Sequence, residues 1–190
     1  MFRTIGIDGD GKWDGSADAF RALVNQHKSM VFSIAYRMLG DRGIAEEVAQ
    51  DVFLELYRWM DRLESEAHIT FWLRRTATHR STDAIRRRKL RPETAAEEWE
   101  ESFERAVFAG GGADAGDRAM SLSAQLERVL LTLPEQQRAA IVLRYQEDMS
   151  PNEIARVTGE TVPAVKSNLQ RGMALLRRKS AVLLREFVRG

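Results

Sequence analysis

The sequence predicts an all-α protein made of two small helical domains joined by a flexible acidic linker. Apolar residues recur at three- and four-residue spacings over most of the chain, no segment shows the alternation of a strand, and charge changes sign in blocks. With 190 residues, 44% of them hydrophobic, the chain can form one ordinary domain or two small ones. We divide it into a tail (1–16), a first domain (17–91), the linker (92–117) and a second domain (118–190).

The composition excludes several classes of protein. The chain contains no cysteine, which excludes disulfide scaffolds, cysteine zinc sites and thiol nucleophiles and fits a reducing compartment. No run approaches the ~20 apolar residues of a membrane span, and residues 1–12 lack the apolar core of a signal peptide. The histidines show no metal-ligand spacing. We therefore expect a cytoplasmic protein with no membrane insertion, no metal and no cofactor.

The first domain is expected to contain three amphipathic helices, at 17–39, 43–62 and 69–85. Gly40 is placed to end the first helix. The inward side chains of the second helix are expected to include Leu56 and Tyr57. A short polar loop, 64–68, precedes the third helix, which passes directly into the basic run 86–91.

This third helix carries a concentrated positive charge. Residues 67–91 hold eight basic and one acidic residue, and five of the six residues in 86–91 are cationic. Cations at this density bind phosphate without selecting sequence, although such a run is also typical of a solvated helix end. Phe71 and Trp72 lie upstream, and at least one of them is expected to serve the core.

The linker has the opposite charge. Residues 92–117 hold eight acidic residues and one basic residue, and they include Gly110, Gly111 and Gly112. Pro92 disfavours helix in the residue before it. The composition favours a tether between domains. Its apolar residues, such as Trp99, also suit a helix that docks on a partner or lies on the surface.

The second domain is expected to contain four helices, at about 121–133, 134–147, 151–158 and 163–187. Pro134 is expected as the first residue of its helix. Ser150 and Glu153 form the capping-box pattern, and Gly159 supplies the next turn. The last two helices have the proportions of a helix-turn-helix that binds DNA. An ordinary helical hairpin with a polar face is the alternative.

The last helix carries donors away from its apolar stripe. Lys166, Ser167, Gln170 and Arg171 offer ammonium, hydroxyl, amide and guanidinium groups, which suit base edges and phosphates. These side chains favour the helix-turn-helix interpretation over a surface that serves only solubility.

Four motifs in the right order carry a family resemblance. They are Ala45-Glu46-Glu47-Val48-Ala49-Gln50-Asp51-Val52-Phe53-Leu54; Phe71-Trp72-Leu73 with Ala77, His79, Asp83 and Arg86; Leu133-Pro134-Glu135-Gln136-Gln137-Arg138; and Glu153-Ile154-Ala155 with Val165-Lys166-Ser167. Through them the chain resembles the extracytoplasmic-function (ECF) group of the bacterial sigma-70 family of RNA polymerase sigma factors. The resemblance covers roughly residues 20–176.

The resemblance implies a sigma region 2 domain at 17–91 and a sigma region 4 domain at 118–190. Such a chain binds core RNA polymerase, through the β′ clamp helices and the β flap, and directs initiation at promoters by recognising their −10 and −35 elements. The implied partners are core polymerase, promoter DNA and an anti-sigma factor. No catalytic residues are implied.

The resemblance also assigns roles to residues. Those implied to bind core polymerase are Glu47, Gln50 and Asp51. Those implied at the −10 element are Leu63, Glu64, Ser65 and His68, in a loop that captures a flipped base, followed by His79, Asp83, Arg86, Arg87 and Arg88 on the third helix. Those implied at the −35 element are Pro163, Ala164, Lys166, Ser167, Gln170 and Arg171.

The sequence departs from the family at the recognition helix. Pro163 and Ala164 stand where Gly-Thr is common, and Asn168 stands where Arg is common. His79 replaces a frequent Asn, and a partly buried helix residue is an equal interpretation of it. These departures leave the −35 sequence unassigned.

The resemblance implies that the linker passes near the polymerase active centre and the RNA exit path. Its negative charge resembles that of a nucleic-acid backbone, so it suits a cationic channel. A free coil of 26 residues averages about 28 Å, whereas promoter elements two helical turns apart lie roughly 70 Å from one another. The linker is therefore expected to be extended on the polymerase.

Two rival functions remain at this point. A helix-turn-helix transcriptional regulator acting independently of core polymerase would explain the second domain but not the basic run after Phe71-Trp72-Leu73. An enzyme is a weaker rival. Gly110-Gly111-Gly112 is not followed by the Lys-Ser/Thr of a phosphate-binding loop. The sequence also shows no pattern of catalytic nucleophile or metal-ligand residues.

Overall fold

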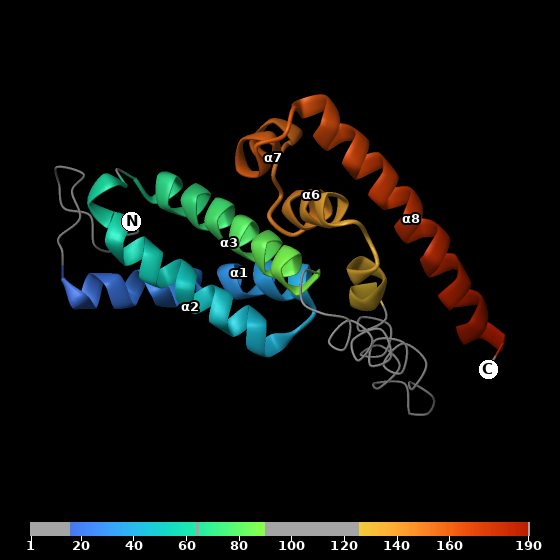
Figure 1. Cartoon of the computed structure of the whole chain (residues 1–190), viewed down its shortest axis with the longest axis horizontal. Helices are drawn as coiled ribbons and strands as arrows, with labels where there is room; N and C mark the ends of the chain where they lie inside the picture. Colours follow the sequence, from blue (N-terminus) through green and yellow to red (C-terminus); the bar gives the residue numbers. More distant parts are fainter. Residues whose placement is uncertain (1–15, 64, 90–125, 190) are drawn as a thin grey trace, which may run out of the picture.

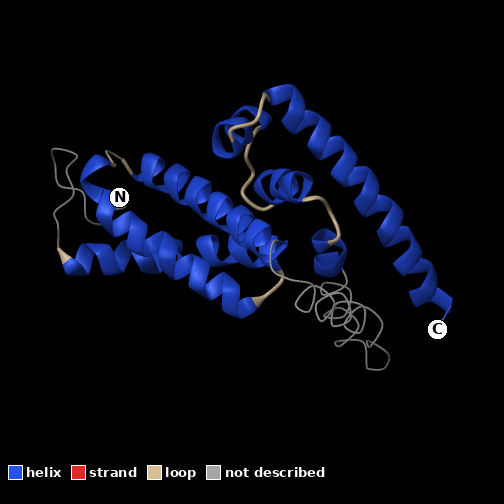
Figure 2. Ribbon diagram, in the orientation of Figure 1, coloured by secondary structure: helices blue, strands red, loops and turns tan. Residues whose placement is uncertain are grey.

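The computed structural model describes residues 16–63, 65–89 and 126–189, and the predicted tail and acidic linker lie outside these residues. Figure 2 shows helices joined by loops, with no strand in the described part of the chain, which confirms the all-α prediction. Within those same residues, no helix is long and apolar enough to cross a membrane. The helices are α1 (Ala17–Leu39), α2 (Arg42–Trp59), the 3-10 helix η1 (Met60–Arg62), α3 (Glu66–Lys89), a helical stretch at 126–131, α6 (Glu135–Tyr145), α7 (Pro151–Thr158) and α8 (Val162–Arg189).

Local capping sets the ends of α1 and α2. The Ser16 hydroxyl accepts a hydrogen bond from the Ala19 amide at 3.0 Å, and the Asp41 carboxylate accepts one from the Ile44 amide at 3.0 Å. Gly40 ends α1 in the left-handed conformation, at φ 69°. The predicted first helix and its terminating glycine are confirmed.

The three long helices α1, α2 and α3 form a bundle (Figure 1). Its core contains fully buried side chains from each of them, including Ile34, Leu56 and Leu73. The prediction that Tyr57 points inward is wrong: its side chain is 64% exposed, and its ring packs edge to face with that of Phe20, with 5.2 Å between the ring centres. Successive residues on a helix point about 100° apart, so the inward Leu56 leaves its neighbour facing outward.

The polar loop before α3 is shorter than predicted. α3 begins at Glu66, and Ser65 precedes it, with its hydroxyl accepting a hydrogen bond from the His68 amide at 3.2 Å. A serine in this position satisfies one of the free amides of the first helical turn. His68 therefore lies in the first turn of α3 rather than in the loop.

The helix-turn-helix follows the predicted pattern closely. Ser150 and Glu153 form both hydrogen bonds of a capping box, at 3.3 and 2.8 Å, and open α7. Gly159 ends α7 at φ 76°. α6 begins after Pro134, which is its N-cap rather than its first residue, and ends at Tyr145, two residues earlier than expected.

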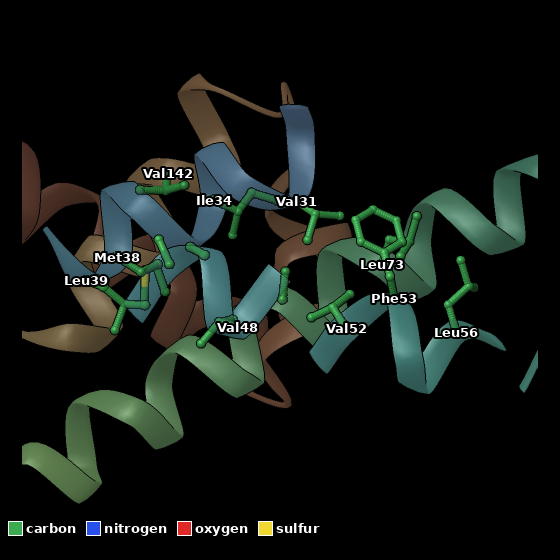
Figure 3. Close-up of a cluster of buried hydrophobic side chains, with 14 of the residues drawn as sticks. Val31, Ile34, Met38, Leu39, Val48, Val52, Phe53, Leu56, Leu73 and Val142 are labelled. Carbon is green, nitrogen blue, oxygen red and sulfur yellow. The ribbon is translucent and has the colours of Figure 1, made fainter. Parts of the chain in front are cut away.

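The two domains pack against each other. α6 contacts α1 and α3, and α7 contacts α3. Figure 1 shows α6 and α7 facing the bundle, with α8 on their far side. Val142 of α6 belongs to the same buried cluster as Ile34 and Met38 of α1 (Figure 3). The hydrophobic core is thus continuous across the two domains.

A buried histidine makes the stability of the first domain sensitive to pH. His27 is 6% exposed, and its Nε2 has no hydrogen-bond partner among the described residues. Burial lowers the pKa of its imidazole below 6.5; nearby Glu66 opposes this shift and Arg74 adds to it. The folded chain therefore resists protonation at a pH where the unfolded chain accepts a proton.

We expect the free energy of unfolding to fall as the pH drops below about 6.5, by up to ~1.4 kcal/mol per pH unit, until the folded pKa is reached. Urea denaturation of wild type and His27→Gln at pH 7.5 and 5.5 measures this. The glutamine variant should lose less stability between the two pH values. His68→Gln, a change at an exposed histidine, is the control. An equal pH dependence in wild type and His27→Gln would contradict the assignment.

Candidate nucleic-acid and polymerase interfaces

The outer face of α3 carries most of the residues predicted at the −10 element. His79, Asp83, Arg86 and Arg87 are all exposed, and they follow one another at helical spacing along the same helix. The basic residues fall in the last turn of α3, where the negative end of the helix dipole favours them. This face can contact a phosphate backbone over several turns.

The predicted base-capturing loop is reduced by the early start of α3. Leu63 is only 7% exposed and belongs to the core, so its side chain is not presented to a ligand. Ser65 and His68 are exposed, and Glu64 lies outside the described residues. Among the described residues predicted in this loop, the exposed polar side chains beside the buried Leu63 are therefore those of Ser65 and His68.

The exposed indole of Trp59, close to this loop in the sequence, was not predicted. Trp59 is 41% exposed, and the Arg62 guanidinium lies 4.4 Å from the centre of its ring. Tyr57 and Leu54 are also exposed on α2. An indole on the surface provides a stacking platform for an unpaired base. The sequence did contain a signal for this exposure, because Trp59 lies outside the apolar stripe of α2.

Contacts with the second domain engage part of the α3 face. The Glu135 carboxylate of α6 accepts hydrogen bonds from Arg86 at 3.3 Å and from Lys89 at 3.2 Å. Burial by itself would raise the pKa of Glu135, but hydrogen bonds and positive charge from Lys89 and Arg86 together hold it below its ordinary value. His79 Nε2 lies 2.7 Å from the Val157 carbonyl oxygen.

Helix α8 presents the donor face predicted for the −35 element. Lys166, Gln170 and Arg171 are exposed, as is Pro163, while Ala164 and Ser167 are partly buried. Thr161 precedes the helix, and its hydroxyl accepts from the Ala164 amide at 3.4 Å. Ile154 and Val157 of α7 pack with Val165 of α8 in one buried cluster.

Asn168, one of the departures from the family pattern, has a local partner. Its side-chain amide donates to both carboxylate oxygens of Glu160 at 3.2 Å. This residue therefore stabilises the turn before α8. Within the described residues it acts on its own domain rather than extending the donor face.

The residues predicted to bind core polymerase form an exposed face of α2. Glu47, Gln50 and Asp51 are all exposed, at i, i+3 and i+4, which places them on one side of the helix. Arg80 of α3 donates to Glu55 at 2.7 Å and fixes α2 against α3. No group of His, Asp and Glu side chains in the described part of the chain could hold a metal ion.

Comparison with known proteins identifies both domains. The family model for sigma-70 region 2 matches residues 23–91, and that for sigma-70 region 4 matches residues 123–176. The chain is 31% identical over 169 residues to the ECF RNA polymerase sigma factor SigW of Bacillus subtilis, covering 87% of this chain and 90% of that protein.

Two solved structures have a similar fold. One is the sigma factor RpoE from Bartonella quintana in complex with the anti-sigma factor NepR, with a TM-score of 0.63, 19% identity, and coverage of 87% of this chain and 99% of that one. The other is CnrH in complex with the cytosolic domain of CnrY, with a TM-score of 0.60, 24% identity, and coverage of 89% and 90%. The chain belongs to the ECF group of the sigma-70 family of RNA polymerase sigma factors.

Proposed function

We propose that this chain binds core RNA polymerase in the cytoplasm and directs it to promoters by contacting a −10 element with α3 and a −35 element with α8. One observation carries the proposal: a single chain of this family presents an exposed cationic face on α3 and a separate donor face on α8. Phosphate contacts would position each domain, and the donors of α8 would select bases. The chain itself would contribute no chemical step.

In vitro transcription with core polymerase and a promoter library tests this function. A sigma factor confers specific initiation on core enzyme. A helix-turn-helix regulator acting independently of core polymerase binds DNA but gives no transcript with core enzyme alone. Absence of any sequence-selected transcript would overturn the proposal.

For the polymerase, we propose that Glu47, Gln50 and Asp51 dock on the β′ clamp helices and that region 4 docks on the β flap. The double variant Gln50→Ala/Asp51→Ala should bind core polymerase about tenfold more weakly, because it loses a carboxylate and an amide from the middle of this face. Affinity is measured by titrating fluorescent chain with core enzyme. Asp18→Ala/Asn25→Ala, which removes an exposed carboxylate and amide from α1, is the matched control. Equal affinities of both variants would refute the docking assignment.

For the −35 element, we propose that Pro163 and Ala164 lie at the start of the contact, and that Lys166, Ser167, Gln170 and Arg171 enter the major groove. Arg171→Ala should weaken promoter binding by holoenzyme roughly tenfold, within the range of one base or phosphate contact. Footprinting at the −35 element measures it. Arg178→Ala, an equal charge loss further along α8, is the control. A footprint like that of wild type would count against Arg171.

For the −10 element, we propose that His79, Asp83, Arg86, Arg87 and Arg88 lie along the DNA backbone. Glu64 and Ser65, with His68 in the first turn of α3, would receive the flipped base, while Leu63 anchors the segment in the core. The exposed Trp59 beside this segment supports a stacking role there. An anti-sigma factor is a further proposed partner, because the structurally similar RpoE was solved with one.

A further inference from the structure

A carboxylate stands at the entrance of the helix proposed for the −35 element. Glu160 lies in the turn from α7 into α8, two residues before Val162, the first residue of that helix (Figure 1). In helix-turn-helix proteins, the residues at the start of the second helix contact base edges. None of the other side chains proposed at this element carries a negative charge. Because a carboxylate repels phosphate, its place at this end of α8 calls for a separate explanation.

The backbone of this turn is held on both sides of Glu160. Gly159 ends α7 in the left-handed conformation, and the Glu160 amide donates to the Thr158 hydroxyl at 3.4 Å. The Thr161 hydroxyl accepts from the Ala164 amide at 3.4 Å. A Cβ placed on Gly159 would meet no atom of the described residues within 4 Å, so there is open space beside the turn. Glu160 is thus a partly exposed side chain on an ordered turn.

The side chain of Asn168 orients the Glu160 carboxylate. Its amide nitrogen lies 3.2 Å from each of the two carboxylate oxygens. A carboxylate only accepts hydrogen bonds, so the nitrogen of the amide, and not its oxygen, must face it. No cation of the described residues forms an ion pair with Glu160. Within the described part of the chain, the negative charge is therefore oriented but not neutralised.

The contact between Glu160 and Asn168 lies on the stripe of α8 that borders the donor face. Ala164, Asn168 and Arg171 are spaced at i, i+4 and i+7, which places them on one side of the helix. Ala164 and Arg171 both belong to the set proposed at the −35 element. The carboxylate meets Asn168 in the middle of this stripe. A base that contacts the stripe therefore finds an acceptor between a methyl group and a guanidinium.

A carboxylate distinguishes the four bases by their edges in the major groove. Cytosine presents the N4 amino donor there, whereas guanine presents two acceptors and thymine one. Adenine carries its amino donor beside the N7 acceptor, which suits an amide side chain better than a group that only accepts. Cytosine is therefore the base that a carboxylate binds without facing an acceptor.

We propose that Glu160, oriented by Asn168, selects a cytosine in the −35 element by accepting a hydrogen bond from its N4 amino group. The inference rests on the proposed function, in which α8 enters the major groove at a promoter. Glu160 contacts the base, and Asn168 is a positioning residue that acts through it. The carboxylate also rejects guanine and thymine by repulsion. An arginine at position 168 would pair with the carboxylate and neutralise it, whereas asparagine leaves its charge available to the base.

Selection from a promoter library with a randomised −35 element tests the assignment. Holoenzyme made with the wild-type chain should favour cytosine at one position, by about five- to tenfold over each other base. Glu160→Gln should lower the preference for cytosine over adenine at this position about fivefold, because an uncharged amide suits adenine. The preferences at the other positions should not change. An unchanged preference for cytosine in this variant would overturn the proposal.

A matched control separates base selection from a general effect of charge. Asp148→Asn removes the same charge from a fully exposed carboxylate of region 4 that lies outside α8. Asparagine also tolerates the positive φ of this position, 51°. The control should keep the wild-type base preferences. If Glu160→Gln instead weakened selection equally at every −35 position, Glu160 would serve only the folding of the turn, and the inference would be wrong.

Variants of Asn168 test the positioning role while the carboxylate stays in place. Asn168→Ala should weaken the preference for cytosine about threefold, as expected for one lost hydrogen bond. Asn168→Arg should abolish it, because the guanidinium pairs with Glu160. A preference for cytosine at wild-type strength in both variants would contradict the inference.

The same library distinguishes this inference from the proposed function. If holoenzyme with the wild-type chain initiated from no library promoter, the proposed function would fall and the inference with it. Initiation with −35 selection that does not depend on Glu160 would overturn the inference alone.

Discussion

Replacing Arg138 by methionine is expected to lower the free energy of unfolding by about 3 kcal/mol. The Arg138 guanidinium is buried and donates hydrogen bonds to three backbone carbonyl oxygens, those of Met38, Leu131 and Leu133. Burial lowers its pKa to about 10, so it remains charged at neutral pH. Methionine fills similar volume but leaves the three carbonyl groups without these donors.

Two of these carbonyls belong to helix ends, which explains why an arginine is suited to the position. Met38 lies in the last turn of α1, and Leu131 ends the helical stretch 126–131. The last carbonyls of a helix have no partner within it, and a cation there also interacts favourably with the dipole. Arg138 therefore caps the carboxyl end of one helix in each domain.

Urea denaturation followed by circular dichroism measures the effect. Arg144→Met is the matched control, because Arg144 lies on the same helix, is half-exposed and donates to the Met149 carbonyl at 3.0 Å. We expect the control to cost no more than about 1 kcal/mol. A loss in Arg138→Met within 1 kcal/mol of the control would contradict the structural role given to Arg138.

Replacing Gly40 by alanine is expected to cost about 2–3 kcal/mol, from two separable causes. Gly40 has φ 69°, where a side chain costs roughly 1–2 kcal/mol. A Cβ at this position would also overlap Leu131 Cδ1 and lie 2.9 Å from its Cδ2. These methyl groups are the far end of a partly buried, flexible side chain, so moving them aside costs only about 1 kcal/mol. The two domains could also separate to relieve the overlap. Its cost therefore cannot exceed the free energy by which the contact between the domains stabilises the folded chain.

A double-mutant cycle separates the two causes. In the Leu131→Ala background the overlap is relieved, so Gly40→Ala should cost only the backbone strain of about 1–2 kcal/mol. Denaturation of wild type, both single variants and the double variant gives the coupling free energy. Costs that add to within about 0.5 kcal/mol would show that the region 4 leucine does not press on the α1–α2 turn.

The elements that depend on neighbouring residues were predictable from the sequence. The α1 helix, its terminating Gly40 and the capping box of Ser150 with Glu153 all match the prediction. Caps and apolar stripes involve residues at most four positions apart, so their determinants lie within one short window. The wrong predictions also concerned local features. Ser65 caps α3, so this helix begins earlier than expected, and Tyr57, next to the buried Leu56, is exposed.

The family motifs placed the three candidate faces on helices, and the structure presents most of their residues at the surface. Arg88, Ala164 and Ser167 are partly buried, and Leu63 is buried because its apolar side chain completes the core at the end of η1. Trp59 was missed although it lies outside the apolar stripe of α2, which is the sequence signal of an exposed side chain.

What the sequence by itself determined is therefore the set of helices, their caps and the separation of charge into a cationic α3 and an acidic linker. Only the tertiary structure decided which surfaces meet. Arg138 is joined to the Met38 carbonyl 100 residues away, and Glu135 to Lys89 46 residues away. An apolar or charged stripe indicates that a helix packs against another surface, but it does not indicate which surface. The choice depends on the summed packing of two complete domains, so the contacts of α3 with the second domain could be seen only in the folded chain.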